Sequence, residues 1–255
     1  MSMMEVVPTA TRSRGAGSIV VAAAIYLALR LAGFHSLFRD DAEGLGALLQ
    51  IIGTLYSVVY AFAIYVIWGQ FAAVENEILK ESGALKDLIL FSKGLKETIR
   101  EPIVHAIRGY ARTVTEMEWA ALSRGKEIDR TDKLFSAIIS SVTEAKPEDE
   151  LGRRAHDHML EIAGQASAHR DERLALSRKR IPRTLLVFVT LTATAIVFLL
   201  LFFPFHNLAL GLIAIGLTTM LLFFAHFVLT DLDNPFEGTW NVDAGAFDDL
   251  VTKYR

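Results

Sequence analysis

Small and polar side chains recur at helical spacing within an uncharged apolar segment, residues 44–74. An α-helix turns by about 100° per residue, so positions three, four or seven apart share one face. The residues of this face that could line a pore are Gln50, Thr54, Ser57, Ala61, Ile64 and Trp68. One interpretation is close packing between membrane helices, which small residues and hydroxyls favour. In the other, several copies surround an axis, and Ser57, Ala61 and Ile64 form a narrow neck.

A second group of polar side chains follows the last apolar segment. This exit motif comprises Asp231, Asp233, Asn234, Pro235, Phe236, Glu237 and Gly238. Proline opposes helical continuation and glycine allows a tight turn, so the motif predicts a structured exit. Its oxygens could accept hydrogen bonds from backbone donors or contribute to a calcium site. We expect the first and no calcium dependence, because calcium prefers about six to eight oxygens and one motif supplies only part of that shell.

Catalysis is not predicted by any set of side chains. The chain has no cysteine, which excludes thiolate zinc sites, iron–sulfur clusters and cysteine nucleophiles. The sequence also lacks nucleotide-binding glycine loops and the HExxH and GxSxG motifs. His156 and His158 lie two positions apart and point to different sides of a helix; with His105 and His169, we expect them to be solvated or at subunit contacts. We therefore predict that the protein is not an enzyme and has no metal or cofactor.

The distribution of charge predicts a membrane protein. Hydrophobic residues make up 52% of the 255 residues and charged residues 22%. The charges are concentrated, since 20 of the 26 lysines and arginines and 19 of the 29 acids lie within residues 75–183. A net charge of −3 provides no basic field for nucleic acid. We expect the lipid bilayer to be a partner and nucleic acid not to be one.

Four segments are apolar enough to cross a bilayer, which takes about 20 residues. They span approximately residues 17–34, 44–74, 184–203 and 207–229. Beyond Glu75, apolar residues still recur every three or four positions, so we expect the second span to continue outside the membrane as one helix. Charged residues are absent from the middle of every span, which argues against a pump or a coupled carrier.

Positive charge near the span ends predicts the orientation. Arg12 and Arg14 precede the first span, and a basic cluster at residues 178–183 precedes the third. The loop at residues 34–43 is dominated by acids, and the link at residues 204–207 has no lysine or arginine. We therefore expect a multi-pass protein of the plasma (inner) membrane with both termini and the charged middle in the cytoplasm.

Together these patterns predict an all-α, polytopic membrane protein with four transmembrane helices and a cytoplasmic helical bundle between the second and third spans. The expected divisions are an N-terminal cytoplasmic tail (1–16), a first transmembrane hairpin (17–74), a cytoplasmic helical domain (75–183), a second transmembrane hairpin (184–229) and a cytoplasmic C-terminal segment (230–255). In the helical domain, we expect Pro102 to open a helix that Gly125 stops, Asp132 to cap a second helix, and residues 147–150 to start a third.

Several motifs resemble those of the bacterial bestrophin-like membrane proteins. They are residues 56–62 (YSVVYAF) with Trp68, residues 110–112 (YAR), residues 116–119 (EMEW) and residues 232–238 (LDNPFEG). The resemblance covers roughly residues 45–250. More distant kinship to true bestrophins would imply a pentameric ion channel with four spans, a pore lined by the second span and a cytoplasmic helical vestibule. In bestrophins, an Asn-Pro-Phe-like sequence leads into a dense acidic calcium clasp, whereas here the acids after Glu237 resume only at Asp243.

Two hypotheses about function follow. In the first, the chain forms a bestrophin-like homo-oligomer, a pentamer, that conducts small inorganic anions such as chloride through a pore lined by the second span. In the alternative, it is a non-conducting membrane scaffold or sensor whose cytoplasmic helices bind a partner.

Overall fold

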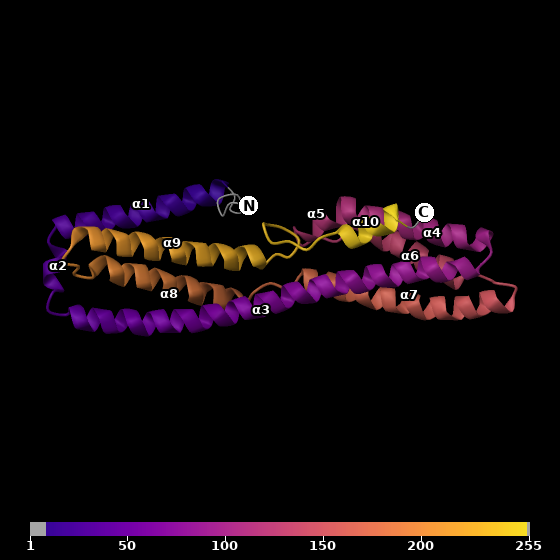
Figure 1. The fold of residues 1–255 in the computed structure, drawn as a ribbon, viewed down its shortest axis with the longest axis horizontal. Helices are drawn as coiled ribbons and strands as arrows, with labels where there is room; N and C mark the ends of the chain where they lie inside the picture. Colours follow the sequence, from indigo (N-terminus) through magenta and orange to yellow (C-terminus); the bar gives the residue numbers. More distant parts are fainter. Residues whose placement is uncertain (1–8, 254–255) are drawn as a thin grey trace. The chain divides into compact units, whose positions relative to one another are not determined.

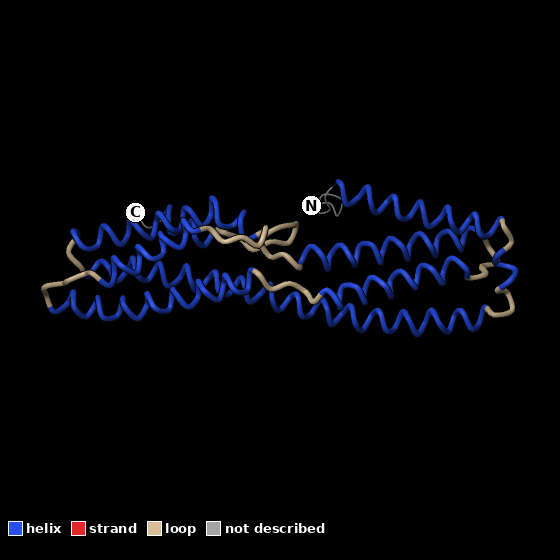
Figure 2. The backbone as a smooth tube through the Cα atoms, turned by 180° about the vertical axis from the view of Figure 1, so that it is seen from behind, coloured by secondary structure: helices blue, strands red, loops and turns tan. Residues whose placement is uncertain are grey.

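The computed structural model describes residues 9–253, and every regular element in them is helical (Figures 1 and 2). The elements are α1 (Thr9–Leu31), α2 (Phe34–Leu37), α3 (Ala42–Phe91), the 3₁₀ turn η1 (Ser92–Gly94), α4 (Glu97–Thr113), the π-helix η2 (Val114–Glu118), α5 (Trp119–Leu122), α6 (Asp129–Thr143), α7 (Glu150–Ser177), α8 (Arg183–Phe202), α9 (Leu208–Leu232) and α10 (Gly245–Thr252). The predicted all-α fold class is confirmed. The described residues divide into two compact units, residues 9–68 with 181–233 and residues 69–180 with 234–253.

Four helices within the described residues are long and apolar enough to cross a membrane. Their bounds are Ser13–Leu31, Ala42–Gly94, Arg183–Phe202 and Leu208–Leu232. Each overlaps one of the four predicted segments, and α3 continues past Glu75 as a single helix, as expected. Of the predicted tail at residues 1–16, residues 1–8 lie outside the described residues and the remainder belongs to α1.

The first unit packs α1, α8, α9 and the first part of α3 against one another (Figure 1). Tyr26 of α1 is fully buried against Leu201 of α8 and Ile215 of α9. Side chains from one face of α3 are buried against α8 and α9; these are Tyr56, Ala63 and Ile67. Such burial is local, because most apolar side chains of these helices remain exposed in the single chain. Apolar exposure of this extent suits a lipid environment.

Local sequence accounts for the ends of α8 and α9. Pro204 follows α8, and a proline two residues beyond a helix cannot continue it. Asn207 caps α9, since its side-chain oxygen accepts a hydrogen bond of 2.8 Å from the amide of Ala209.

The second unit surrounds one apolar core formed by the second part of α3 with α4, α6, α7 and α10. The largest apolar side chains in it that are fully buried include Tyr110, Phe247, Ile78, Leu85, Leu88, Ile103, Ile107, Leu122 and Ile138. On α4 the buried positions recur every three or four residues, which places one apolar stripe against the core.

Two of the expected helix starts in this unit are wrong. Pro102 lies inside α4, which begins at Glu97 one turn earlier. Asp132 lies inside α6, which begins at Asp129, and its carboxylate pairs with Arg170 instead of capping the helix. An aspartate or a proline permits a helix to start at its position but does not require it. Packing of the preceding turn determines where the helix begins, and assigned helix ends vary by one or two residues. Gly125 with a φ of 67° does follow the end of α5.

The start of α7 agrees with the prediction. Asp149 is its N-cap, and its carboxylate accepts a hydrogen bond from the amide of Gly152 at 2.6 Å.

Candidate functional site

Most of the predicted pore face of α3 is exposed in the single chain. Its exposed members include Gln50, Thr54, Ser57 and Ala61. Trp68 is 51% exposed. Ile64 differs, because it is half-buried and packs against the core of the first unit. Packing within the chain therefore does not account for the small and polar side chains of Gln50, Thr54, Ser57 and Ala61.

The remaining surface of α3 in the first unit is bulky and apolar. It consists of Ile51, Leu55, Val58, Phe62 and Tyr65, all exposed. At 100° per residue this surface lies beside the small, polar face and away from the buried one. Hence α3 has three distinct faces: one buried in its own unit, one bulky and apolar, and one small and polar.

Hydroxyl groups on the small, polar face are satisfied by the helix itself. Thr54 Oγ1 donates to the carbonyl of Gln50, and Ser57 Oγ donates to the carbonyl of Gly53, each at 2.8 Å. Neither hydroxyl proton requires a partner on another helix. The hydroxyl oxygens of Thr54 and Ser57 and the amide of Gln50 belong to exposed residues. They can therefore meet water, ions or a second helix.

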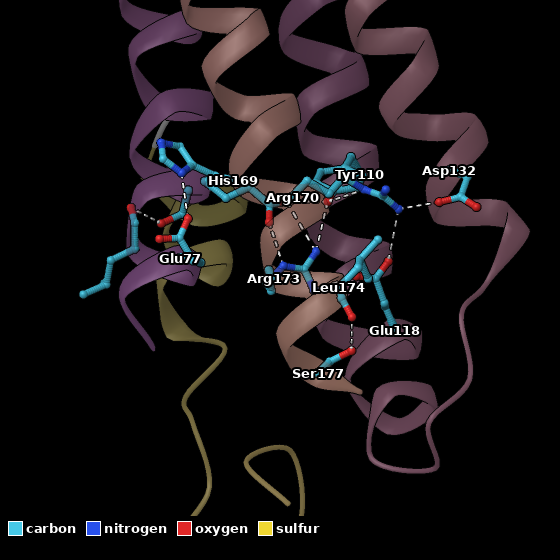
Figure 3. Close-up of polar contacts among 12 residues, drawn as sticks. Glu77, Tyr110, Glu118, Asp132, His169, Arg170, Arg173, Leu174 and Ser177 are labelled. Carbon is cyan, nitrogen blue, oxygen red and sulfur yellow. Dashed lines mark hydrogen bonds and ion pairs between the residues drawn. The ribbon is translucent and has the colours of Figure 1, made fainter. Parts of the chain in front are cut away.

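A cluster of buried charges lies in the second unit, where α3, α7 and the π-helix meet (Figure 3). The guanidinium of Arg173 has no exposed surface; its Nε donates to Glu81 Oε2 at 2.6 Å. On its other side, Nη1 lies 2.7 Å from Glu118 Oε1, and the Glu118 side chain is 1% exposed. Arg173 is thus held between two buried carboxylates, one on the extension of α3 and one on the π-helix.

Arg170, one turn earlier on α7, extends this cluster. Its Nη2 lies 2.5 Å from Asp132 Oδ1, and its Nε donates to the hydroxyl of Tyr110 at 3.2 Å. The guanidinium also stacks over the ring of Phe135 at 5.3 Å. In this way α7 is connected to both α4 and α6.

Tyr110 links the two arginines. Its hydroxyl accepts from Arg173 Nη2 at 3.2 Å and donates to the carboxylate of Glu81. Burial, reinforced by the charge of Glu81, raises the pKa of Tyr110 well above 10, so the phenol stays protonated. Although burial alone would lower the pKa of Arg173, the attraction of Glu81 keeps it well above its ordinary value. Arg173 therefore stays charged; Glu118 meets it by ionic contact, since neither oxygen of that buried carboxylate has a hydrogen bond within the described residues.

An ion pair borders the buried cluster. His169 Nδ1 lies 2.7 Å from Glu77 Oε2, and Lys80 Nζ lies 2.8 Å from the other oxygen of the same carboxylate (Figure 3). Glu77 and Glu81 are one turn apart on α3, and His169 and Arg173 are one turn apart on α7. Two contacts one helical turn apart, Glu77 with His169 and Glu81 with Arg173, therefore join α3 to α7.

The π-helix positions the carboxylate of Glu118. Its turn is wider than that of an α-helix, and such turns occur mostly at functional or strained positions. Here Glu118 is buried and its neighbour Trp119 also packs against the core. The ring of Trp119 lies 5.9 Å from the guanidinium carbon of Arg173, and its Nε1 donates to the carbonyl of Val242 at 3.2 Å.

The exit motif makes specific contacts on both sides of the boundary at residue 233. In the first unit, Asp233 Oδ1 accepts from the amide of Ile181 at 2.6 Å. In the second unit, Asn234 accepts from Arg180 at 3.2 Å and donates to the carbonyl of Ser123 at 2.8 Å. The motif's oxygens are thus engaged by backbone and arginine donors.

The rest of the exit motif forms a turn on the second unit. Pro235 contributes its carbonyl to the amide of Val242 at 2.8 Å. Phe236 is buried, with its ring edge-on to Trp119 at 5.2 Å. Gly238 adopts a φ of 95°, a left-handed conformation that favours glycine. Asp231 and Glu237 complete the motif, and Glu237 accepts a hydrogen bond of 3.3 Å from Asn234.

Three or more histidine, aspartate or glutamate side chains do not gather into a metal-holding group anywhere in residues 9–253. His156 contacts the carbonyl of Val142 at 2.8 Å, and His158 lies 3.5 Å from Glu161. His105 is exposed. The arrangement of His169 with Glu77 was not expected from the sequence.

The buried charge cluster is the feature that sequence reasoning missed. A signal for it was present, because Arg170 and Arg173 fall on the same three- and four-residue spacing as the buried Met159, Ala163 and Ala166. A charged residue on an apolar stripe predicts a buried partner. The partners could not be identified, since they lie on α3 and the π-helix, far away in the sequence.

Comparisons with known proteins agree with this fold. A family model described as the Bestrophin-like domain matches residues 16–247. A crystal structure of a bacterial bestrophin homologue from Klebsiella pneumoniae with a single substitution has a TM-score of 0.70 and 11% identity, covering 94% of this chain and 98% of that one. A second structure of that homologue, with another substitution, gives 0.69 and 9%, covering 94% and 97%. No curated protein matches the sequence significantly.

Proposed function

Because this chain belongs to the family of the Bestrophin-like domain, we propose that it is an ion channel of the plasma (inner) membrane. In this proposal, identical chains, five in number, assemble around an axis, and the small, polar face of α3 lines the pore. Both termini and the second unit lie in the cytoplasm. The channel conducts small anions and performs no catalysis.

The observation that supports the pore most directly is the exposed face of α3. A helix inside a membrane can present small and polar side chains either to another helix or to water. Gln50, Thr54, Ser57 and Ala61 are exposed in the single chain, so whatever covers them is supplied by other copies or by water. A ring of copies provides both: the bulky apolar face meets a neighbour or lipid, and the small, polar face meets the axis.

Small anions are the proposed substrate because the segment at residues 44–74 contains no carboxylate. A ring of acids is a common cation-selecting device, and this face lacks one. Gln50 adds amide donors that can coordinate an anion.

Reconstitution into liposomes tests conduction with a matched pair of variants. Ala61→Phe adds a large ring to the pore face, whereas Val58→Phe adds the same ring to the bulky face. We expect chloride flux in the wild type, a large loss in Ala61→Phe because the ring narrows the pore, and wild-type flux in Val58→Phe. Equal effects of the two changes would refute the assigned pore face. A correctly assembled wild type without flux of any small ion would favour the non-conducting scaffold.

Ile64 tests the narrow neck separately. If it constricts the pore, Ile64→Ala widens and wets the neck, and the flux rises. If Ile64 only packs against its own unit, the same change creates a void that costs about 1–3 kcal/mol and leaves the flux unchanged. Flux and melting temperature measured on the same preparation separate these outcomes.

A further inference from the structure

A polar pocket of about 240 Å³ lies in the first unit where α1 is followed by α2 and where the link between α8 and α9 returns. The side chains that line it and have donors to offer a ligand are Arg30, His35, Arg39 and His206, whereas the hydroxyl of Ser36 donates to the carbonyl of Gly33 at 2.6 Å. Two of these are guanidinium groups and two are imidazoles. Carboxylates are missing from the lining, although Asp40 and Asp41 follow directly in the chain.

Backbone oxygens hold the Arg30 side chain in place. Its Nη1 donates to the carbonyl of Phe205 at 2.7 Å, and its Nη2 donates to the carbonyl of His206 at 2.9 Å. Nη1 also donates to the hydroxyl of Tyr26 at 3.1 Å. These neutral acceptors orient the guanidinium without neutralising it, so a fixed positive charge faces the pocket.

Neither arginine of the pocket is paired. Among the ion pairs of the described residues, within 4.0 Å, none includes Arg30 or Arg39. Arg30 is half-buried and Arg39 is exposed. A partly desolvated cation without a counter-charge is unfavourable, and a bound anion would relieve this cost. The guanidinium of Arg39 presents a planar set of N–H donors, which suits the binding of oxyanions.

Two histidines also line the pocket. His35 is buried edge-on against the ring of Tyr26 at 4.9 Å. His206 is exposed, and it stands on a different chain segment from Arg39. Donors therefore come from the end of α1, from the α2 region and from the α8–α9 link. Such a spread suits a tetrahedral oxyanion better than the two coplanar oxygens of a carboxylate.

We propose that this pocket binds a phosphate-type oxyanion, either a free ion or the phosphate of a lipid headgroup. Both sources offer the same chemistry to Arg30 and Arg39. The lipid source fits the position of Arg30 at the end of the first apolar helix, where headgroups are expected. The site is independent of the proposed pore, because none of its residues belongs to α3.

The free-ion source is tested by calorimetric titration of the full chain, purified in detergent and in a chloride-free buffer, with inorganic phosphate. The test variant is Arg39→Gln, because Arg39 is exposed and outside every ion pair above. The control is Arg153→Gln, an exposed arginine of α7. We expect phosphate affinity to fall about tenfold or more in Arg39→Gln, the effect of losing one charge-assisted contact, and to be unchanged in the control.

The lipid source is tested on the same proteins by native mass spectrometry after incubation with phosphatidylglycerol. Retention of lipid that drops in Arg39→Gln and is displaced by free phosphate identifies a headgroup as the occupant. Phosphate binding without specific lipid retention identifies a free ion. Absence of both kinds of binding in the wild type, or equal binding by Arg39→Gln and Arg153→Gln, would overturn the proposal. Equal melting temperatures of the two variants establish that the comparison concerns binding and not folding.

Discussion

At the residue scale, the fully buried guanidinium of Arg173 shows how the second unit uses charge. Glu81 and Glu118 lie at 2.6 and 2.7 Å, and the rings of Trp119 and Phe247 enclose it. Burial of two or more charges is costly and contributes little net stability compared with an apolar replacement of similar shape. Removing only one partner is different, because it leaves an unpaired charge in the core. The cluster is therefore better suited to fixing the register of α3 against α7 than to increasing stability.

Arg173→Leu should accordingly lower the stability of the second unit strongly. It strands two buried carboxylates, and loss of one partner of a buried ion pair typically costs about 3–5 kcal/mol. The control is Arg154→Leu on the same helix, whose side chain is 77% exposed and pairs only with Glu150. Thermal unfolding in detergent should show a large fall in melting temperature for Arg173→Leu and almost none for the control. Similar falls for both would contradict a buried, paired Arg173.

Tyr110 predicts a dependence of stability on alkaline pH. In the unfolded chain its phenol loses its proton near pH 10, whereas burial keeps the folded pKa well above that value. The folded state then binds more protons than the unfolded state, so stability falls as pH rises above about 10. Tyr110→Phe removes this contribution, although losing the hydroxyl costs about 1–3 kcal/mol at neutral pH.

The measurement is the fall in melting temperature between pH 7 and pH 11. We expect a smaller fall in Tyr110→Phe than in the wild type. Tyr65→Phe, at a side chain that is 77% exposed, should retain the wild-type fall. The idea fails if Tyr110→Phe and the wild type lose the same amount.

At the element scale, periodicity predicted the long helices well and the local starts poorly. The continuation of α3 beyond the second span follows from apolar residues every three or four positions. The π-helix does not follow from such a pattern, because one wide turn changes the register only locally. Pro102 and Asp132 carried start signals that the structure does not use. Where a helix starts depends on which of its turns pack against neighbouring helices, and the local sequence does not contain that information.

In the exit motif, the side chain of Asp233 stabilises the backbone just before α8 through a hydrogen bond. Asp233→Ala should destabilise the start of α8, because the amide of Ile181, a buried residue, loses its acceptor at 2.6 Å. The expected cost is about 1–3 kcal/mol, measured as a lower melting temperature and poorer assembly on size exclusion. Asp157→Ala, at an exposed position of α7, is the control and should change neither.

The same variant tests the calcium alternative. Because the oxygens of Asp233 and Asn234 are engaged by backbone and arginine donors, we expect no calcium dependence of stability or flux. Stoichiometric calcium binding by the wild type that is lost in Asp233→Ala would show that the motif is a calcium clasp after all.

At the scale of the whole molecule, the lengths of the apolar segments and the helical periodicity of the charged middle predicted the all-α fold class and the four apolar helices. The partners of Arg173 and the pocket at Arg30 could not be predicted, because each joins segments far apart in the chain. The exposure of the small, polar face of α3 needed the structure as well. A helical pattern identifies a face but not what covers it.

The remaining whole-molecule prediction is the topology, with both termini and the second unit on the cytoplasmic side. The chain has no cysteine, so a thiol-reactive label can react only with the cysteine that is introduced. Ser36→Cys lies between the first two spans, and Ser136→Cys lies on α6; both positions are exposed. Ser177 would be a poor probe, because it is 1% exposed and donates to the carbonyl of Leu174. A membrane-impermeant maleimide should label Ser36→Cys in intact cells and Ser136→Cys only in inside-out vesicles, since basic residues at 178–183 favour retention of the second unit in the cytoplasm. Labelling of both cysteines from one side would contradict this topology, because it requires an even number of spans between them and not the single span expected.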